Sequence, residues 1–126
     1  MNIGIDYDFP SMNMVCAKLE PLVWLVKHKN WKVEKVQAFI SPSGKGWHIR
    51  IQIMSGWFCN GPNEFEQRAY ELMAGDDPWR HAYSMARGEM PHETPLFEVK
   101  CKGKTIGKEQ YHRKFSKRIR EMFGTV

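Results

Sequence analysis

The stretch SPSGKGWHIRIQI, residues 41–53, decides how the rest of the chain is arranged. Its first half is a Ser-Gly-Lys-Gly turn, and its second half alternates isoleucines with polar residues that include His48 and Arg50. Such alternation is typical of a strand with one face on a core and the other face polar. The preceding segment 31–41 is rich in β-branched and aromatic residues. We therefore predict a hairpin in which 31–41 pairs with 46–54.

The segments around this hairpin carry their own periodicities. Residues 2–8 alternate in the same way and predict a strand. Apolar positions at helical spacing predict a helix over 12–29, in which Pro21 either kinks the helix or lies in the first turn of a shorter one. The remaining expected elements are a helix from Asn63 to about Met73, a helix from an Asp77 N-cap to a Gly88 stop, a strand in LFEVKCK (96–102), a turn with a short strand in GKTIG (103–107) and a basic helix over 108–123.

The order β-α-β-β-α-α-β-α predicts one α+β domain over residues 1–126. An antiparallel sheet with helices on one face, in an RRM-like or ferredoxin-like layout, satisfies this order most simply. The helix side would carry Ile3, Ile5, Tyr7, Ile49, Ile51, Ile53, Phe97, Val99 and Cys101. The opposite, open face would carry Asp6, Asp8, His48, Arg50, Gln52, Glu98 and Lys100.

Charge points to a polyanionic partner. The net charge is +5, and from residue 100 onward nine Lys and Arg residues stand against two glutamates. A basic segment of this kind attracts nucleic acid or anionic membrane, or is simply a solvated helix face.

Cysteine usage and hydropathy bear on the compartment. The three cysteines form no C-x-x-C pair, so we expect neither a disulfide framework nor a zinc knuckle. No apolar run approaches the ~20 residues of a membrane span, and the N-terminus lacks a signal-peptide pattern. We expect a cytoplasmic protein without a membrane partner.

Two features of the expected open face suggest chemistry. Asp6 and Asp8 point the same way from one strand, and Mg²⁺ or Mn²⁺ would relieve their mutual repulsion. The turn residues Ser43, Gly44, Lys45 and Gly46 could present backbone N–H groups and one cation to a phosphate, although they also suit an ordinary hairpin turn. His48 and Arg50 would add further phosphate contacts.

In combination, IDYDFP and SPSGKGWHIRI resemble the archaeo-eukaryotic primase superfamily, including the primase-polymerase domains of bacterial end-joining ligases. That family's first motif is an apolar residue followed by D-x-D, and its second is S-G-x-G-x-H on a hairpin. Its third is an apolar residue followed by Asp or Glu on a later strand. The matching residues are Asp6 and Asp8 for the first motif, Ser43, Gly44, Gly46 and His48 for the second, and Glu98 for the third.

The resemblance implies a minimal or degenerate nucleotidyltransferase of a virus or plasmid, located in the host cytoplasm. Asp6, Asp8 and Glu98 would be catalytic and would hold two Mg²⁺ or Mn²⁺ ions that activate a 3′-hydroxyl for attack on the α-phosphate. The nucleoside triphosphate would be bound by Ser43, Gly44, Lys45, Gly46, His48 and Arg50.

Nucleic acid would contact basic residues outside this centre, namely Arg80, Arg87, Lys100, Arg113, Lys117 and Arg120. On the helix that follows Asp77, we expect Arg80, Ser84 and Arg87 to share a face while Trp79, Tyr83 and Ala86 pack inward.

Two rival functions use the same fold. A non-catalytic RRM-like module would present Arg50, Lys100 and Trp47 to single-stranded nucleic acid. Trp47 and Trp57 could stack bases in such a module, or they could belong to the core. A rolling-circle endonuclease would need an H-x-H motif, which the sequence lacks.

Overall fold

The computed structural model describes residues 2–54, 64–88, 98–101 and 104–124. The elements in chain order are β1 (Asn2–Tyr7), α1 (Met12–His28), β2 (Lys32–Ile40), β3 (Trp47–Met54), α2 (Glu64–Met73), α3 (Pro78–Arg87), β4 (Glu98–Cys101), β5 (Lys104–Lys108), β6 (Gln110–Tyr111) and α4 (Arg113–Met122). Pro21 lies inside α1, which continues through it. Among these residues no helix combines the length and apolar character needed to cross a membrane.

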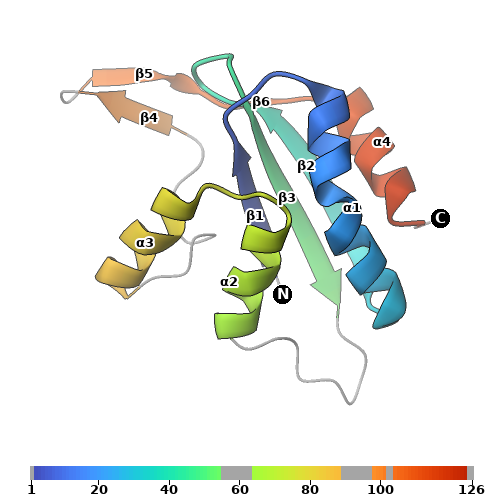
Figure 1. The fold of residues 1–126 in the computed structure, drawn as a ribbon. Coiled ribbons are helices and arrows are strands. Elements are labelled where there is room, and N and C mark those ends of the chain that lie inside the picture. Colours follow the sequence, from blue (N-terminus) through green and yellow to red (C-terminus); the bar gives the residue numbers. More distant parts are fainter. Residues whose placement is uncertain (1, 55–63, 89–97, 102–103, 125–126) are drawn as a thin grey trace.

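Four strands form an antiparallel sheet in the order β1-β3-β2-β6 (Figure 1). The predicted hairpin is present, because β2 and β3 pair with Ile40 opposite Trp47. β1 pairs with the other side of β3, so α1 connects two strands that have β3 between them. This register places Ile5 opposite Ile49 on one face and Asp6 opposite His48 on the other.

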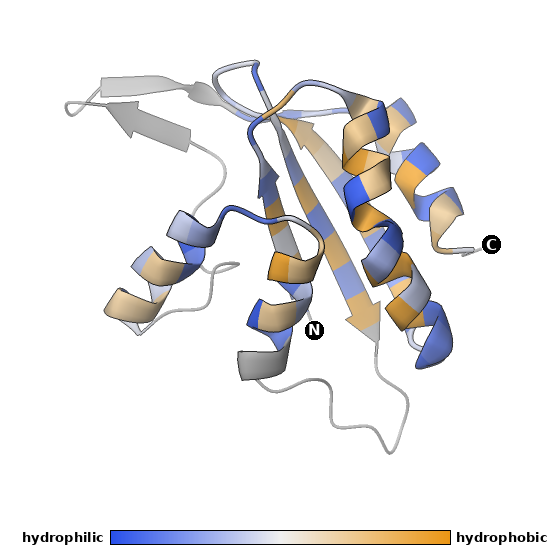
Figure 2. Cartoon of the chain, viewed as in Figure 1, coloured by the Kyte–Doolittle hydropathy of each residue, from blue (hydrophilic) through white to orange (hydrophobic). Residues whose placement is uncertain are grey.

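The apolar face of the sheet carries the core. Ile3, Ile5, Ile49, Ile51 and Ile53 are at most 1% exposed, and they cluster with the buried apolar residues of α1 and α4. Figure 2 shows the alternation of hydrophobic and hydrophilic residues along β2 and β3 that makes this arrangement stable. The predicted α+β class with an antiparallel sheet is confirmed.

One predicted strand lies elsewhere. Residues 98–101 pair with 104–108 in a separate two-stranded sheet, so Glu98 and Lys100 do not belong to the four-stranded sheet as we expected. Only the two residues 102 and 103 separate these strands, which favours pairing between neighbours in the sequence. The side chains of 98–101, and all of Phe97, lie outside the described residues.

The outer edge of β1 has no neighbouring strand within the described part of the chain, and side chains satisfy its main-chain groups. Glu71 Oε2 accepts a hydrogen bond from Gly4 N at 3.0 Å, and Asp76 Oδ1 accepts one from Asp6 N at 2.6 Å. Carbonyl groups of the same edge accept from Arg80 (to Gly4 O, 3.1 Å) and from Gln67 (to Asn2 O, 2.5 Å). Because an open strand edge is a site of unwanted pairing, this cover also protects β1.

The hydrogen bonds to the outer edge of β1 determine which face of α3 turns toward the sheet. Asp77 caps this helix through Trp79 N, and Gly88 ends it in the left-handed conformation, as predicted. The predicted faces were wrong, however: Trp79 is 81% exposed and Tyr83 59% exposed, whereas Ser84 is fully buried. The polar face of α3 turns inward because the β1 edge and the carboxylate of Asp76 need hydrogen-bond partners.

At Gly46 the hairpin turn approaches the end of β1 closely. A Cβ on Gly46 would lie 2.1 Å from the carbonyl oxygen of Tyr7. We expect Gly46→Ala to lower the free energy of unfolding by about 1–3 kcal/mol, the usual cost of overpacking. The measurement is urea unfolding, with Lys45→Ala at the exposed neighbouring position as control. Equal midpoints for the two variants would contradict this close approach.

Candidate functional site

Four side chains on the polar face of the sheet form a continuous network, here called the His48 network. His48 Nε2 lies 3.2 Å from Asp6 Oδ1, its partner across the β1–β3 pair. His48 Nδ1 lies 2.8 Å from Glu109 Oε2, and Arg50 donates to the other oxygen of Glu109 at 2.9 Å. The predicted meeting of Asp6, His48 and Arg50 on one face is thus present, with Glu109 as an additional member.

The two carboxylates determine the protonation of His48. Burial by itself lowers the pKa of His48, but the hydrogen bonds and charges of Asp6 and Glu109 outweigh it and raise the pKa above its ordinary value. A protonated ring can donate from both nitrogens, so the imidazolium satisfies both carboxylates. His48 is 6% exposed, and Glu109 lies against it on the sheet face that we expected to be open. The imidazolium therefore acts as a cation between two carboxylates.

Asp8 lies just beyond the end of β1 and is exposed to solvent. Burial and the negative charges of Asp6 and Asp77 raise its pKa, and His48 opposes the effect. Burial is the larger cause, and the like charges of Asp6 and Asp77 add to it because they disfavour ionisation.

The main-chain N–H groups of the Ser-Gly-Lys-Gly turn donate hydrogen bonds within the turn. Gly44 N donates to Ser41 O at 2.8 Å, Gly46 N donates to Ser41 Oγ at 3.0 Å, and Lys45 N reaches Ser43 Oγ at 3.4 Å. Gly44 has φ 74°, a conformation that favours glycine. The turn therefore presents the exposed Lys45 side chain, rather than a set of free N–H groups, beside the end of β1.

The other predicted binding residues are dispersed. Arg113, Lys117 and Arg120 are exposed on α4, and Arg87 is exposed at the end of α3. Arg80 is not at the surface: its side chain is 8% exposed and bonds Gly4 O and Asp76. Trp47 is buried (6% exposed) and belongs to the core. The side chains of Lys100, Glu98 and Trp57 lie outside the described residues.

A second polar cluster lies between α2, α3 and β1. His81 Nε2 is 2.6 Å from Asp76 Oδ2, and Arg68 donates to Ser84 Oγ at 2.7 Å. Burial raises the pKa of Glu71 to about 8, although its bond from Gly4 N acts in the opposite direction. Glu71 Oε1 and His81 Nδ1 are buried without a hydrogen-bond partner among the described residues.

Sequence reasoning assigned no role to Glu71 or Glu109 and did not place Asp76 in the site. Glu71 belongs to a helix whose polar residues are expected to face solvent. Asp76 precedes Asp77, and helix capping by Asp77 is a sufficient explanation for an acidic residue at this point. Glu109 was assigned to a basic helix beginning at 108, whereas α4 begins at Arg113. One local signal was available: α3 carries more polar residues than a helix needs when it packs an apolar face on a sheet. This excess indicates polar partners for the buried face of α3.

Asp6 and Asp8 are the two carboxylates that the sequence suggests as ligands of a hard divalent cation. Asp6 and Asp8 supply oxygen donors of the type that Mg²⁺ and Mn²⁺ prefer, and burial together with the charges of Asp6 and Asp77 raises the pKa of Asp8. In the part of the chain that the structure describes, no three His, Cys, Asp or Glu side chains are already arranged to hold a metal ion. The predicted third carboxylate, Glu98, is not on this sheet.

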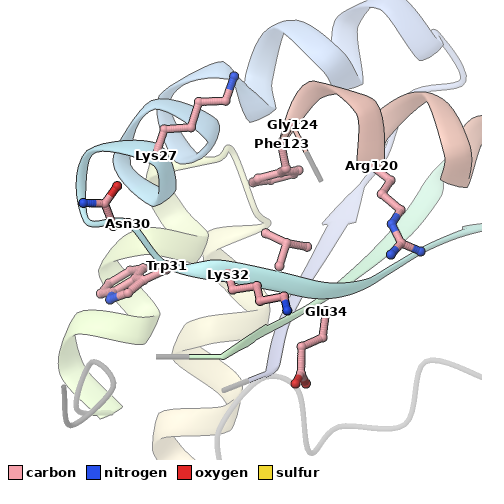
Figure 3. A pocket seen from close by; sticks show the side chains of 9 residues that line it. Lys27, Asn30, Trp31, Lys32, Glu34, Arg120, Phe123 and Gly124 are labelled. Atoms are coloured by element: carbon pink, nitrogen blue, oxygen red, sulfur yellow. The ribbon is translucent and has the colours of Figure 1, made fainter. Parts of the chain in front are cut away.

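An open pocket lies at the other end of β2 from the hairpin turn (Figure 3). The ends of α1 and α4 and the start of β2 form its walls, which include Lys27, Trp31, Lys32, Arg120 and Phe123. Lys27 and Arg120 belong to the last turns of their helices, where cations compensate the helix dipole. In Figure 3 the side chains of Lys27 and Glu34 extend in opposite directions, so the charges do not converge on one ligand position.

Comparisons with known proteins find no match to this chain, whether among protein-family models, curated proteins or solved structures.

The His48 network predicts a measurable titration. Glu109→Gln removes one of the two carboxylates that stabilise the imidazolium, so we expect the pKa of His48 to fall toward or below its ordinary value. NMR titration of the His48 ring protons measures it, with Glu121→Gln at an exposed position of α4 as control. An unchanged His48 pKa in Glu109→Gln would contradict the network.

Glu71 predicts a pH dependence of stability. The ordinary pKa of 4.5 returns on unfolding, so between pH 4.5 and about 8 the folded chain holds more protons than the unfolded chain. Its contribution to stability therefore falls as pH rises through this window and is constant above it, with a slope of at most ~1.4 kcal/mol per pH unit. In Glu71→Gln this slope should disappear from the free energy of unfolding, measured in urea from pH 5 to 9. A variant as pH-dependent as the wild type would contradict the assignment to Glu71.

Proposed function

We propose that this protein is a nucleic-acid-associated, minimal nucleotidyltransferase that binds a nucleoside triphosphate with Mg²⁺ or Mn²⁺ at the Asp6–Asp8 end of β1. The observation that carries the proposal is the convergence of Asp6 and His48, 3.2 Å apart on one face of the sheet, beside the hairpin turn. Two stretches separated by more than thirty residues in the sequence, each matching a primase-type motif, thus meet at one place.

The chain's own residues would take distinct parts. Asp6 and Asp8 would hold the cation, and the exposed Lys45 would contact the outer phosphates. His48 would position Asp6, because both of its nitrogens are engaged by carboxylates. Glu109 would be a second positioning residue rather than a cation ligand, because its two oxygens contact His48 and Arg50.

A bound divalent cation would neutralise the triphosphate and lower the pKa of an attacking hydroxyl. The cation would also reduce the repulsion that raises the pKa of Asp8. Nucleic acid would be held by the exposed basic residues of α4, which face away from the core.

A second candidate, a non-catalytic module for single-stranded nucleic acid, is favoured by two aromatic rings on the same sheet face. Phe39 and Tyr111 pair across β2 and β6 with ring centroids 5.6 Å apart. The guanidinium of Arg50 lies 5.0 Å from the centroid of Phe39, and Tyr111 is 54% exposed. An exposed ring next to a half-buried ring and a cation is suited to stacking bases.

Metal-dependent nucleotide binding separates these candidates. We expect Mn²⁺ to bind in isothermal titration and to increase the affinity for a nucleoside triphosphate. Asp8→Asn should weaken Mn²⁺ binding at least ~10-fold, a loss of about 1.4 kcal/mol, without disturbing the His48 network. Glu20→Gln, an exposed acidic position on α1, is the matched control.

The first candidate is overturned if nucleotide binding is the same in Mn²⁺ and in EDTA. Single-stranded nucleic acid that binds equally in both conditions, and more weakly to Tyr111→Ala, would then support the second candidate. Incorporation of labelled nucleotide into a primer, lost in Asp8→Asn and retained in Glu20→Gln, would establish the enzymatic function.

A further inference from the structure

Helix α3 is amphipathic in the reverse sense to an ordinary surface helix. Its buried face carries the polar residues Arg80, His81 and Ser84, which bond β1, Asp76 and Arg68. Its exposed face carries Trp79, 81% exposed, and Tyr83, 59% exposed. A contiguous group of exposed apolar side chains is typical of an interaction surface.

Three residues on this exposed face follow one another at four-residue intervals. Trp79, Tyr83 and Arg87 are here called the α3 strip, and consecutive members are about 6 Å apart on a helix. The guanidinium of Arg87 lies 4.8 Å from the ring centroid of Tyr83, so the cation and the ring present one continuous surface. The positions beside them, Ala82 and Ala86, are small and leave the rings accessible.

The strip begins at the proposed site. Asp76, just before α3, accepts from Asp6 N, and Arg80 in the first turn donates to Gly4 O. In Figure 1, α3 extends from this edge of the sheet on the side away from α1 and α4. A linear ligand held at Asp6 and Asp8 could continue directly along the strip.

We propose that the α3 strip binds single-stranded nucleic acid, with bases stacked on Trp79 and Tyr83 and a phosphate paired with Arg87. This inference rests on the proposed function, since the strand is the one on which the site at Asp6 and Asp8 would act. Steps of about 6 Å exceed the 3.4 Å spacing of a stacked duplex strand, so they suit an extended strand whose bases stack on protein rings.

The composition of the strip favours this occupant over a protein. It offers two rings and one cation, with the exposed Met85 elsewhere on α3, in a chain of net charge +5. A polyanion with flat bases complements both features.

Fluorescence anisotropy of a labelled oligodeoxythymidylate of about 12 nucleotides tests the proposal, with the oligouridylate of the same length as the ribose counterpart. We expect Trp79→Ala and Tyr83→Ala each to weaken binding about 5-fold to 100-fold. Trp24→Ala is the matched control, because Trp24 is 65% exposed on α1 and should leave binding unchanged. Asp8→Asn should retain oligonucleotide binding in EDTA, and Trp79→Ala should retain Mn²⁺-dependent nucleotide binding, so the two proposals fail separately.

Equal affinities for wild type, Trp79→Ala and Tyr83→Ala, in variants with unchanged circular dichroism, would overturn the strip. A wild-type dimer in sedimentation that becomes a monomer in Trp79→Ala, with oligonucleotide affinity unaltered, would overturn it as well, because a second copy would then cover this face.

Discussion

The structure depends on how the unpaired edge of β1 is satisfied. Main-chain N–H and C=O groups at a sheet edge need partners, and among the described residues no strand is beside this one. Carboxylates from Glu71 and Asp76 accept the N–H groups of Gly4 and Asp6, and Arg80 donates to a carbonyl of the same edge. These bonds attach the α2–α3 segment to β1, and Ala74 and Tyr70 join the same segment to the apolar core.

This constraint has consequences on both sides of α3. The inward face must be polar, which buries Arg80, His81 and Ser84 and turns Trp79 and Tyr83 toward solvent. The same attachment brings Asp76 and Asp77 to the end of β1, where Asp6 and Asp8 already stand. Negative charge therefore accumulates at one end of the strand, and the cations of the His48 network and Arg80 oppose it. The candidate cation site and the exposed aromatic strip have one common cause.

The His48 network shows how one cross-strand pair can organise a surface. With Asp6 on one side and Glu109 on the other, the imidazolium is held on both nitrogens, and Arg50 completes the neutralisation of Glu109. A histidine so constrained is better suited to fixing a carboxylate than to binding a phosphate directly. This distinguishes the observed arrangement from the one that the motif resemblance implies, in which His48 contacts the nucleotide.

The sequence by itself determined the hairpin at 41–46, the strand parities and the α3 caps, because these follow from local alternation and from turn and capping preferences between neighbouring residues. Only the tertiary structure decided the orientation of α3, the separate pairing of 98–101 and the presence of Glu109 beside His48. The orientation of α3 and the contact of Glu109 with His48 depend on which distant groups satisfy a buried or unpaired polar atom, whereas 98–101 pairs with its neighbour in the sequence. Glu109 is 61 residues from its partner His48, and Asp76 is 70 residues from Asp6, and no local periodicity reports contacts across such separations.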